Sequence, residues 1–179
     1  MEVFKALLVA TVATIVIATA STASASSSAG IPGVVPMHRV DAEQARLRAI
    51  DMEMAPIRSD LDLATYLRTA GNDSPLMALS PGARERFLAT LTFNENGLVG
   101  YKYEELAREL TASQAYRVLA LFGAQRTAYM LGARVDSPAD RAITQRPITP
   151  GLMNDYKEYK CVSPHNCYGQ VLYICLTGC

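Results

Sequence analysis

All four cysteines of this chain lie in its last nineteen residues, CVSPHNCYGQVLYICLTGC. They are Cys161, Cys167, Cys175 and Cys179, with the spacing C-x5-C-x7-C-x3-C. An even number of cysteines in an exported chain usually forms disulfides, whereas cytosolic thiols stay reduced. Two bridges within so short a segment would order that segment locally. The spacing therefore predicts a disulfide-cross-linked tail.

The tail also carries the pattern of a β-hairpin. Residues Gln170–Cys175 (QVLYIC) are rich in β-branched and aromatic side chains, and they can fold back on Tyr156–Val162 across the turn-forming segment SPHNCYG. Four cysteines allow three pairings, and this hairpin places Cys161 opposite the returning strand near Val171–Cys175. The geometry therefore favours the bridges Cys161–Cys175 and Cys167–Cys179.

A zinc site is the alternative use of these residues, with four thiolates, or three thiolates and His165, as its ligands. Structural zinc sites typically contain two closely spaced ligand pairs, and here only Cys175 and Cys179 are that close in sequence. The spacing favours disulfides over zinc, so we expect neither a metal nor a cofactor.

The first 25 residues, MEVFKALLVATVATIVIATASTASA, have the layout of a secretory signal peptide. Lys5 precedes an apolar stretch from Ala6 to Ala18, and Ala23-Ser24-Ala25 fits the small-x-small pattern of a cleavage site. An uncleaved anchor is disfavoured because the stretch is shorter than the roughly 18 to 20 apolar residues that span a bilayer. We therefore expect a secreted or periplasmic protein that has no stable membrane span after cleavage.

The charge of the chain excludes one class of partners. There are 17 basic and 17 acidic residues, and the basic ones are scattered along the chain rather than clustered. Nucleic acids and anionic membranes attract proteins through basic patches. Without such a patch or a nucleic-acid-binding motif, we expect no nucleic-acid partner.

Helix signals follow a linker. Residues 26–36 (SSSAGIPGVVP) are rich in Ser, Gly and Pro, which is typical of a flexible linker. Asp41 is then predicted to cap a helix that ends at Pro56. Apolar residues spaced by three and four give this helix a predicted buried face, which consists of Leu47, Ile50 and Met54.

Later helices are marked by their capping residues. Ser59, Ser80 and Ser137 each precede a helical pattern, and Pro81 and Pro138 suit the first helical position. Thr111 and Gln114 have the spacing of a capping box. The helix that follows this box is predicted to bury three large side chains, Tyr116, Leu119 and Phe122.

One segment inside this region lacks the helical pattern. Residues Leu91–Tyr103 (LTFNENGLVGYKY) contain several Asn and Gly residues and are predicted to form a loop. The sequence therefore predicts a mainly α fold. It consists of a compact bundle of about five short helices over residues 37–146, followed by a disulfide-stapled, hairpin-like tail over residues 147–179.

Catalytic signals are few. The chain has two histidines and no nucleophile, metalloprotease or phosphate-loop motif. Cys167 lies two residues from His165, but an exported cysteine oxidises, which favours a structural role. Helix ends and solvated helix faces account for the available carboxylates, Asp60, Asp62, Glu104, Glu105 and Glu109.

A binding function is indicated by the tyrosines. Four of the nine lie within the last 24 residues, and two more lie in the predicted loop 94–103. Tyrosine offers a large contact area and one hydroxyl at a small entropic cost, although the same rings can instead pack inside the fold. The candidate partner-binding residues are Tyr156, Tyr159, Tyr168, Tyr173, Tyr101 and Tyr103.

Two functions remain open at this point. The sequence favours a small exported interaction protein without catalytic activity that presents its cross-linked tail to a protein or to a component of the cell envelope. The alternative is a small secreted hydrolase or toxin with a site between the 94–103 loop and the tail.

Overall fold

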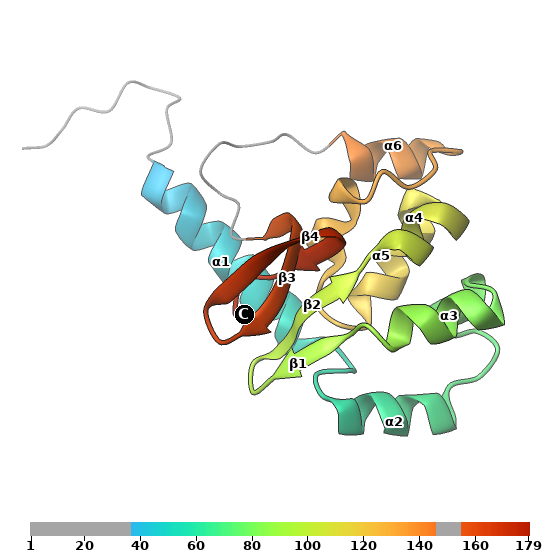
Figure 1. The fold of residues 1–179 in the computed structure, drawn as a ribbon. Coiled ribbons are helices and arrows are strands. Elements are labelled where there is room, and N and C mark those ends of the chain that lie inside the picture. Colours follow the sequence, from blue (N-terminus) through green and yellow to red (C-terminus); the bar gives the residue numbers. More distant parts are fainter. Residues whose placement is uncertain (1–36, 146–154) are drawn as a thin grey trace, which may run out of the picture. The chain divides into compact units, whose positions relative to one another are not determined.

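The structure, a computed structural model, describes residues 37–145 and 155–179 (Figure 1). The predicted signal peptide and linker lie outside these residues, as does the segment 146–154. The helices of the described part are α1 (Met37–Glu53), α2 (Asp60–Thr69), η1 (Pro75–Ala78), α3 (Pro81–Leu88), α4 (Glu104–Glu109), α5 (Ala112–Ala120), η2 (Gln125–Met130) and α6 (Pro138–Thr144). The strands are β1 (Thr92–Asn94), β2 (Gly97–Lys102), β3 (Tyr156–Ser163) and β4 (Asn166–Cys175). None of these helices combines the length and apolarity that crossing a membrane requires.

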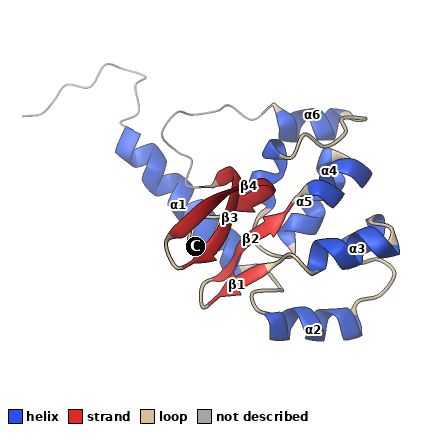
Figure 2. Cartoon of the chain, viewed as in Figure 1, coloured by secondary structure: helices blue, strands red, loops and turns tan. Residues whose placement is uncertain are grey.

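The predicted mainly α fold is wrong, because the fold is mixed α/β. The four strands form one antiparallel sheet in the order β1-β2-β4-β3, so the tail hairpin extends a sheet that begins inside the helical region (Figure 2). Lys102 of β2 pairs with Tyr173 of β4, and these residues are distant in the sequence. The sheet therefore joins the two regions that the sequence analysis treated separately.

The predicted loop 94–103 is also wrong, since it contains the β1–β2 turn and all of β2. Glu95 and Asn96 form the turn, and Gly97, the first residue of β2, has φ +116°, a backbone conformation that favours glycine. Asn-Gly between apolar residues is a strong hairpin signal. The same Asn and Gly residues are also typical of loops, and this is the basis of the loop prediction.

The capping predictions for the later helices are confirmed. The side chains of Ser59, Ser80 and Ser137 accept hydrogen bonds from backbone N–H groups at the starts of α2, α3 and α6. Thr111 and Gln114 form both hydrogen bonds of the predicted capping box at the start of α5. These caps satisfy amide groups that a helix leaves without partners inside itself.

The main core lies between the helices and one face of the sheet. Phe87 of α3 packs edge-on against Tyr101 of β2 and against Phe122, with ring centroids 6.2 and 6.1 Å apart. Leu119 is buried as predicted, but Tyr116 is 40% exposed, so its predicted burial is wrong. The buried side of α5 instead carries Ala112, Ala115, Val118 and Leu119.

The predictions for α1 are wrong in two respects. The helix begins at Met37, so the predicted cap Asp41 lies inside it. In the predicted apolar face, Ile50 is 41% and Met54 is 77% exposed. The helix docks through a polar side, where Arg48 donates a hydrogen bond to the buried Asp155 at 2.5 Å and Asp51 accepts one from Arg126. Apolar spacing cannot reveal a helix that is held by partly buried ion pairs.

Strand β2 is buried on both faces and contains a β-bulge. Thr92 pairs with Gly100 and Phe93 with Leu98, which leaves Val99 as an extra residue in β2. Leu98 and Tyr101 consequently belong to the main core, whereas Val99 packs against the cysteines. The bulge thus places Leu98 and Tyr101 on the same face of β2, although regular alternation would put residues three apart on opposite faces.

Candidate functional site

The candidate site is built on the β3–β4 hairpin. Cα partners run from Ser163–Asn166 at the turn through Cys161–Cys167 to Tyr159–Gly169. His165 lies in the turn with φ +62° and donates its backbone N–H to the carbonyl of Cys179. The hairpin predicted for the tail is therefore present, and its turn is tied to the segment that follows β4.

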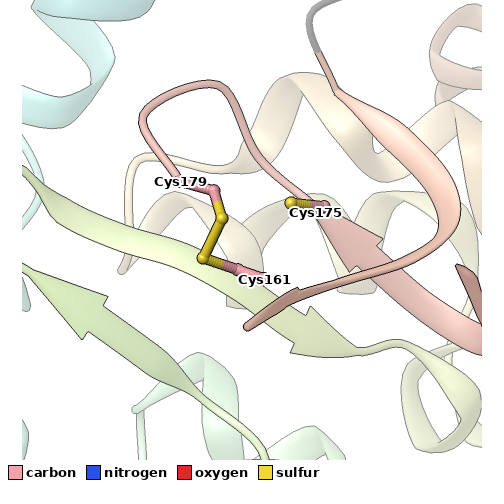
Figure 3. A group of neighbouring side chains, drawn as sticks. All are labelled: Cys161, Cys175 and Cys179. Atoms are coloured by element: carbon pink, nitrogen blue, oxygen red, sulfur yellow. A yellow bond between two sulfur atoms is a disulfide. The ribbon is translucent and has the colours of Figure 1, made fainter. Parts of the chain in front are cut away.

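Two disulfides cross-link the hairpin, but the favoured pairing is wrong. The bridges are Cys161–Cys179 and Cys167–Cys175. The chain turns back after β4, where Leu176 donates to the Val99 carbonyl at 2.8 Å, and this turn brings Cys179 to Cys161 (Figure 3). A pairing argument based on strand register alone could not include this turn.

Three of the candidate tyrosines lie on the surface of the hairpin. Tyr156, Tyr159 and Tyr168 are 50%, 42% and 71% exposed. The rings of Tyr156 and Tyr159 lie 5.8 Å apart. Val162 and Val171 of the hairpin are also exposed, and we call these five exposed residues the hairpin surface.

The other candidate tyrosines lie deeper in the fold. Tyr173 is half-buried, and the Lys160 ammonium lies 5.2 Å from the centre of its ring. Lys160 is also the cross-strand partner of the exposed Tyr168. Tyr101 and Tyr103 are 0% and 5% exposed, which removes both from any partner-binding surface.

Glu158 fixes a kink in β3 and joins the hairpin to Tyr103, the residue that directly follows β2. Its carboxylate accepts hydrogen bonds from the Tyr103 hydroxyl and, at 2.6 Å, from the Leu172 N–H. Glu158 and Leu172 both have positive φ, 68° and 67°, which strains non-glycine residues. Lys157 pairs with Ile174 and Tyr159 pairs with Gly169. Glu158 is therefore the single residue of β3 that lies opposite four residues of β4, 170–173.

The electrostatics of this contact favour a structural role. The hydrogen bond from Tyr103, followed by that from Leu172, lowers the pKa of Glu158, and burial raises the pKa of Tyr103. Near neutral pH the carboxylate is therefore charged and the phenol is neutral, which is the arrangement that the hydrogen bond requires. Sequence reasoning missed Glu158, and its position between two tyrosines was the only local signal.

A cavity of about 430 Å³ lies between α3, α4 and the sheet. Lys102 of β2 and Tyr173 of β4 both line it, so it lies where the hydrolase alternative placed a site. The Glu105 carboxylate is buried in the wall, where it accepts hydrogen bonds from Arg86 at 2.7 Å and from Arg108. The bond from Arg86 is the main cause of the lowered pKa of Glu105.

Three further candidate catalytic groups are also engaged. Glu104 is ion-paired with Lys102 at 2.5 Å, and Cys167 is bonded to Cys175, so it offers no thiolate. Asp62 accepts a hydrogen bond from the Arg58 N–H at the start of α2, in agreement with the predicted helix-end role. A general acid needs a carboxyl that holds its proton near neutral pH, and the lowered pKa of Glu105 opposes that role.

Comparison with protein-family models, with curated proteins and with solved structures gave no match. The function proposed below is therefore argued from the residues and the geometry of the chain itself.

Proposed function

We propose that this chain is a small exported interaction protein without catalytic activity, which presents its cross-linked hairpin to a protein or to a component of the cell envelope. The observation that carries the proposal is the exposure of Tyr156, Tyr159 and Tyr168 on a hairpin with two disulfides. Export rests on the signal-peptide pattern of residues 1–25 and is compatible with the two bridges.

Rigidity supports a binding role for these rings. A flexible segment loses conformational freedom when it binds, and this loss reduces its affinity. The bridges and the Glu158 contacts fix the hairpin before any partner arrives. Exposed tyrosines on such a frame lose little entropy on binding, because each has only two side-chain torsions.

The surroundings of the rings indicate the chemistry of the partner. Val162 and Val171 add apolar area, and the Lys160 ammonium lies over the half-buried ring of Tyr173. A partner that fits would offer an apolar surface with hydrogen-bond acceptors for the phenol groups and a carboxylate for the lysine. Proteins and envelope polymers both provide such surfaces.

The experiment compares capture by three forms of the protein. Immobilised wild type, a Tyr159→Ala/Tyr168→Ala variant and a Tyr116→Ala control are incubated with extracellular and envelope fractions of the producing cells. Tyr116 is a comparably exposed tyrosine on α5, far from the hairpin in sequence. We expect one species to be retained by wild type and by the control but not by the hairpin variant. Equal retention by all three would contradict the proposal.

The second candidate, a secreted hydrolase or toxin, is favoured by one observation. The 430 Å³ cavity between α3, α4 and the sheet is lined by one residue of β2 and one of β4, and it has a size typical of small-molecule sites. The carboxylates of this cavity, Glu104 and Glu105, are already ion-paired, which argues against the hydrolase, so we rank the hydrolase second. Hydrolysis of ester, peptide or glycoside substrates by wild type, abolished by Lys102→Met but retained by the Tyr159→Ala/Tyr168→Ala variant, would favour the enzyme instead.

A further inference from the structure

The two disulfides are close neighbours, and one cysteine lies at the point where they meet. The Sγ atoms of Cys161, Cys175 and Cys179 lie within 4.8 Å of one another, and all three residues are buried (Figure 3). The Cys175 sulfur is bonded to Cys167 and therefore lies beside both sulfurs of the other bridge. A disulfide bond is about 2.0 Å long, so a free Cys175 sulfur would need to move by less than about 3 Å to bond either neighbour.

Room for this cluster is provided by Gly100. Gly100 pairs with Cys175, and a Cβ on it would lie 3.4 Å from the Cβ of Cys161 and 3.3 Å from the Ile174 carbonyl. A side chain here would press on Cys161 and on the backbone carbonyl that directly precedes Cys175. The close approach of the bridges thus depends on a missing side chain in β2.

Access to the sulfur cluster differs among its members. Cys167 is half-buried, whereas Cys161, Cys175 and Cys179 are buried. Thiol–disulfide exchange requires a thiolate to reach a disulfide sulfur, so an external thiol meets Cys167 first. Attack there releases Cys175 as the leaving thiolate, inside the cluster.

We propose that the hairpin is a thiol–disulfide exchange site in which Cys167 receives an external low-molecular-weight thiol and Cys175 relays the exchange to the Cys161–Cys179 bridge. In the first step, the external thiolate bonds to Cys167, the Cys167–Cys175 bond breaks, and Cys175 becomes a thiolate. In the second step, Cys175 bonds to Cys161, the Cys161–Cys179 bond breaks, and Cys179 becomes a thiolate that takes a proton from water. Each step exchanges one S–S bond for another, so no net oxidant is needed.

The contacts of Cys179 identify it as the sulfur that is released. Its Sγ lies 3.4 Å from the Ser163 carbonyl and 3.5 Å from the Asn166 carbonyl. A protonated thiol can donate to such oxygens, whereas Cys161 has the Ser163 carbonyl at 3.9 Å. The neutral thiol is therefore better accommodated on Cys179 than on Cys161.

The Cys167–Cys175 bridge is called the outer bridge below. The test uses two single variants that differ only in which cysteine of this bridge remains. Cys167→Ser leaves Cys175 unpaired inside the cluster, and Cys175→Ser leaves Cys167 unpaired outside it. Both oxidised proteins are held between pH 6 and 8 without added thiol, quenched with acid and alkylated, and their bridges are mapped by mass spectrometry. Circular dichroism verifies that both variants are folded.

For Cys167→Ser we expect alkylation to shift from Cys175 to Cys179 as a Cys161–Cys175 bridge forms. The rate at which this bridge forms should rise about tenfold from pH 6 to pH 7, because the fraction of Cys175 present as thiolate rises about tenfold over that range. It should not depend on protein concentration, because the step is intramolecular. Cys175→Ser should be alkylated at Cys167 alone. A Cys167→Ser protein that keeps Cys161–Cys179 intact throughout would overturn the proposal.

Wild-type protein provides a second measurement that needs no variant to fold. One equivalent of 2-mercaptoethanol is added, and the species carrying one mercaptoethanol group is mapped after alkylation. We expect mercaptoethanol on Cys167 and the alkyl group on Cys179. An alkyl group confined to Cys175 would show that exchange stops at the outer bridge, which contradicts the relay whether or not the hairpin surface binds a partner.

Discussion

The helical body and the cross-linked hairpin are held together by different forces, although one sheet runs through both. In the body, large apolar side chains such as Phe87, Leu106 and Leu119 are almost fully buried in one cluster. In β3, by contrast, the only buried residue is Cys161. A segment of this size cannot bury enough apolar surface to fix itself, so covalent bridges and buried polar contacts take that role. The comparison shows why the cysteines are confined to the tail.

The boundary between the two regions runs through the sheet. The Val99 bulge turns Leu98 and Tyr101 toward the helices and leaves Val99 against the disulfides. Ile174 at the end of β4 belongs to the main core, so the hairpin is anchored there. Damage to the body should therefore reach the hairpin, whereas damage to the hairpin should largely spare the body.

The largest effect is expected from Phe87→Ala, which tests whether the body supports both regions. Removing a buried aromatic ring leaves a cavity and costs about 4 kcal/mol of unfolding free energy. Urea denaturation followed by circular dichroism measures this cost. The control is Leu61→Ala on α2, which is exposed and should be nearly neutral. A similar loss for both variants would contradict the assignment of the core.

Removal of the Cys161–Cys179 bridge tests whether the hairpin can loosen alone. The bridge closes a loop with a sequence separation of 18, and Cys161→Ser/Cys179→Ser should cost about 3 kcal/mol in the loop-entropy model. The Cys167–Cys175 bridge closes a shorter loop, with a sequence separation of 8. Its removal in Cys167→Ser/Cys175→Ser should cost about 2.5 kcal/mol. Helical circular dichroism at 25 °C should remain near that of wild type. Its collapse would mean that the body depends on the bridges.

Arg48→Met tests the ion pair that connects α1 to Asp155, the residue directly before β3 of the hairpin. Asp155 would keep its hydrogen bonds from Thr177 but lose the one from Arg48. A buried carboxylate oxygen would then lack a donor, which should lower the free energy of unfolding by about 2 kcal/mol. Arg46→Met removes only an exposed pair with Glu43 and serves as the control. Equal stability of the two variants would show that α1 does not secure the hairpin.

How far these features could be predicted depends on whether their cause is local. The caps at Ser59, Ser80 and Thr111 depend on residues within one turn of the chain, and all three were predicted from the sequence. The pairing of Lys102 with Tyr173 has no local signal, because it depends on how distant segments pack. The β1–β2 hairpin did have a local signal, Asn96-Gly97, and its omission caused the error in fold class.

The candidate site divides in the same way. The hairpin and the presence of disulfides follow from composition and spacing, and exposed tyrosines were among the residues proposed. The burial of Tyr101 and Tyr103, the pairing of Cys179 with Cys161 and the role of Glu158 all depend on the β2–β4 contact. Without that contact, the sequence could not separate core tyrosines from surface ones.

Glu158→Gln should reveal a pH dependence specific to the hairpin. Because the folded pKa of Glu158 is lowered, its carboxylate stabilises the fold above the unfolded pKa of about 4.3, and this contribution disappears as the pH falls through the folded value. Glutamine cannot accept hydrogen bonds at both positions, so we expect a cost of about 1 kcal/mol at pH 6. Melting temperatures of variant and wild type should converge toward pH 3. A constant difference would exclude this carboxylate as the cause.

The smallest effect on stability is expected from Tyr168→Ala. The ring is mostly exposed, so its removal should change the unfolding free energy by less than about 0.5 kcal/mol. Tyr101→Ala, which empties a core site, should instead cost about 4 kcal/mol. Urea unfolding of the two variants measures the contrast between a surface ring and a core ring. A large loss of unfolding free energy in Tyr168→Ala would indicate that the Tyr168 ring packs inside the fold and is not exposed for binding.

The kink at Glu158 has a consequence for self-association. Strand β3 is at the edge of the sheet, and its outer side is unpaired within the described ranges 37–145 and 155–179. Straight, flat edge strands invite another chain to add a strand, which leads to aggregation. The positive φ of Glu158 interrupts the regular spacing of hydrogen-bonding groups, and Lys157 and Lys160 place charges on either side of it. The protein can therefore expose tyrosines at high density near a sheet edge without offering that edge as a template for fibril growth.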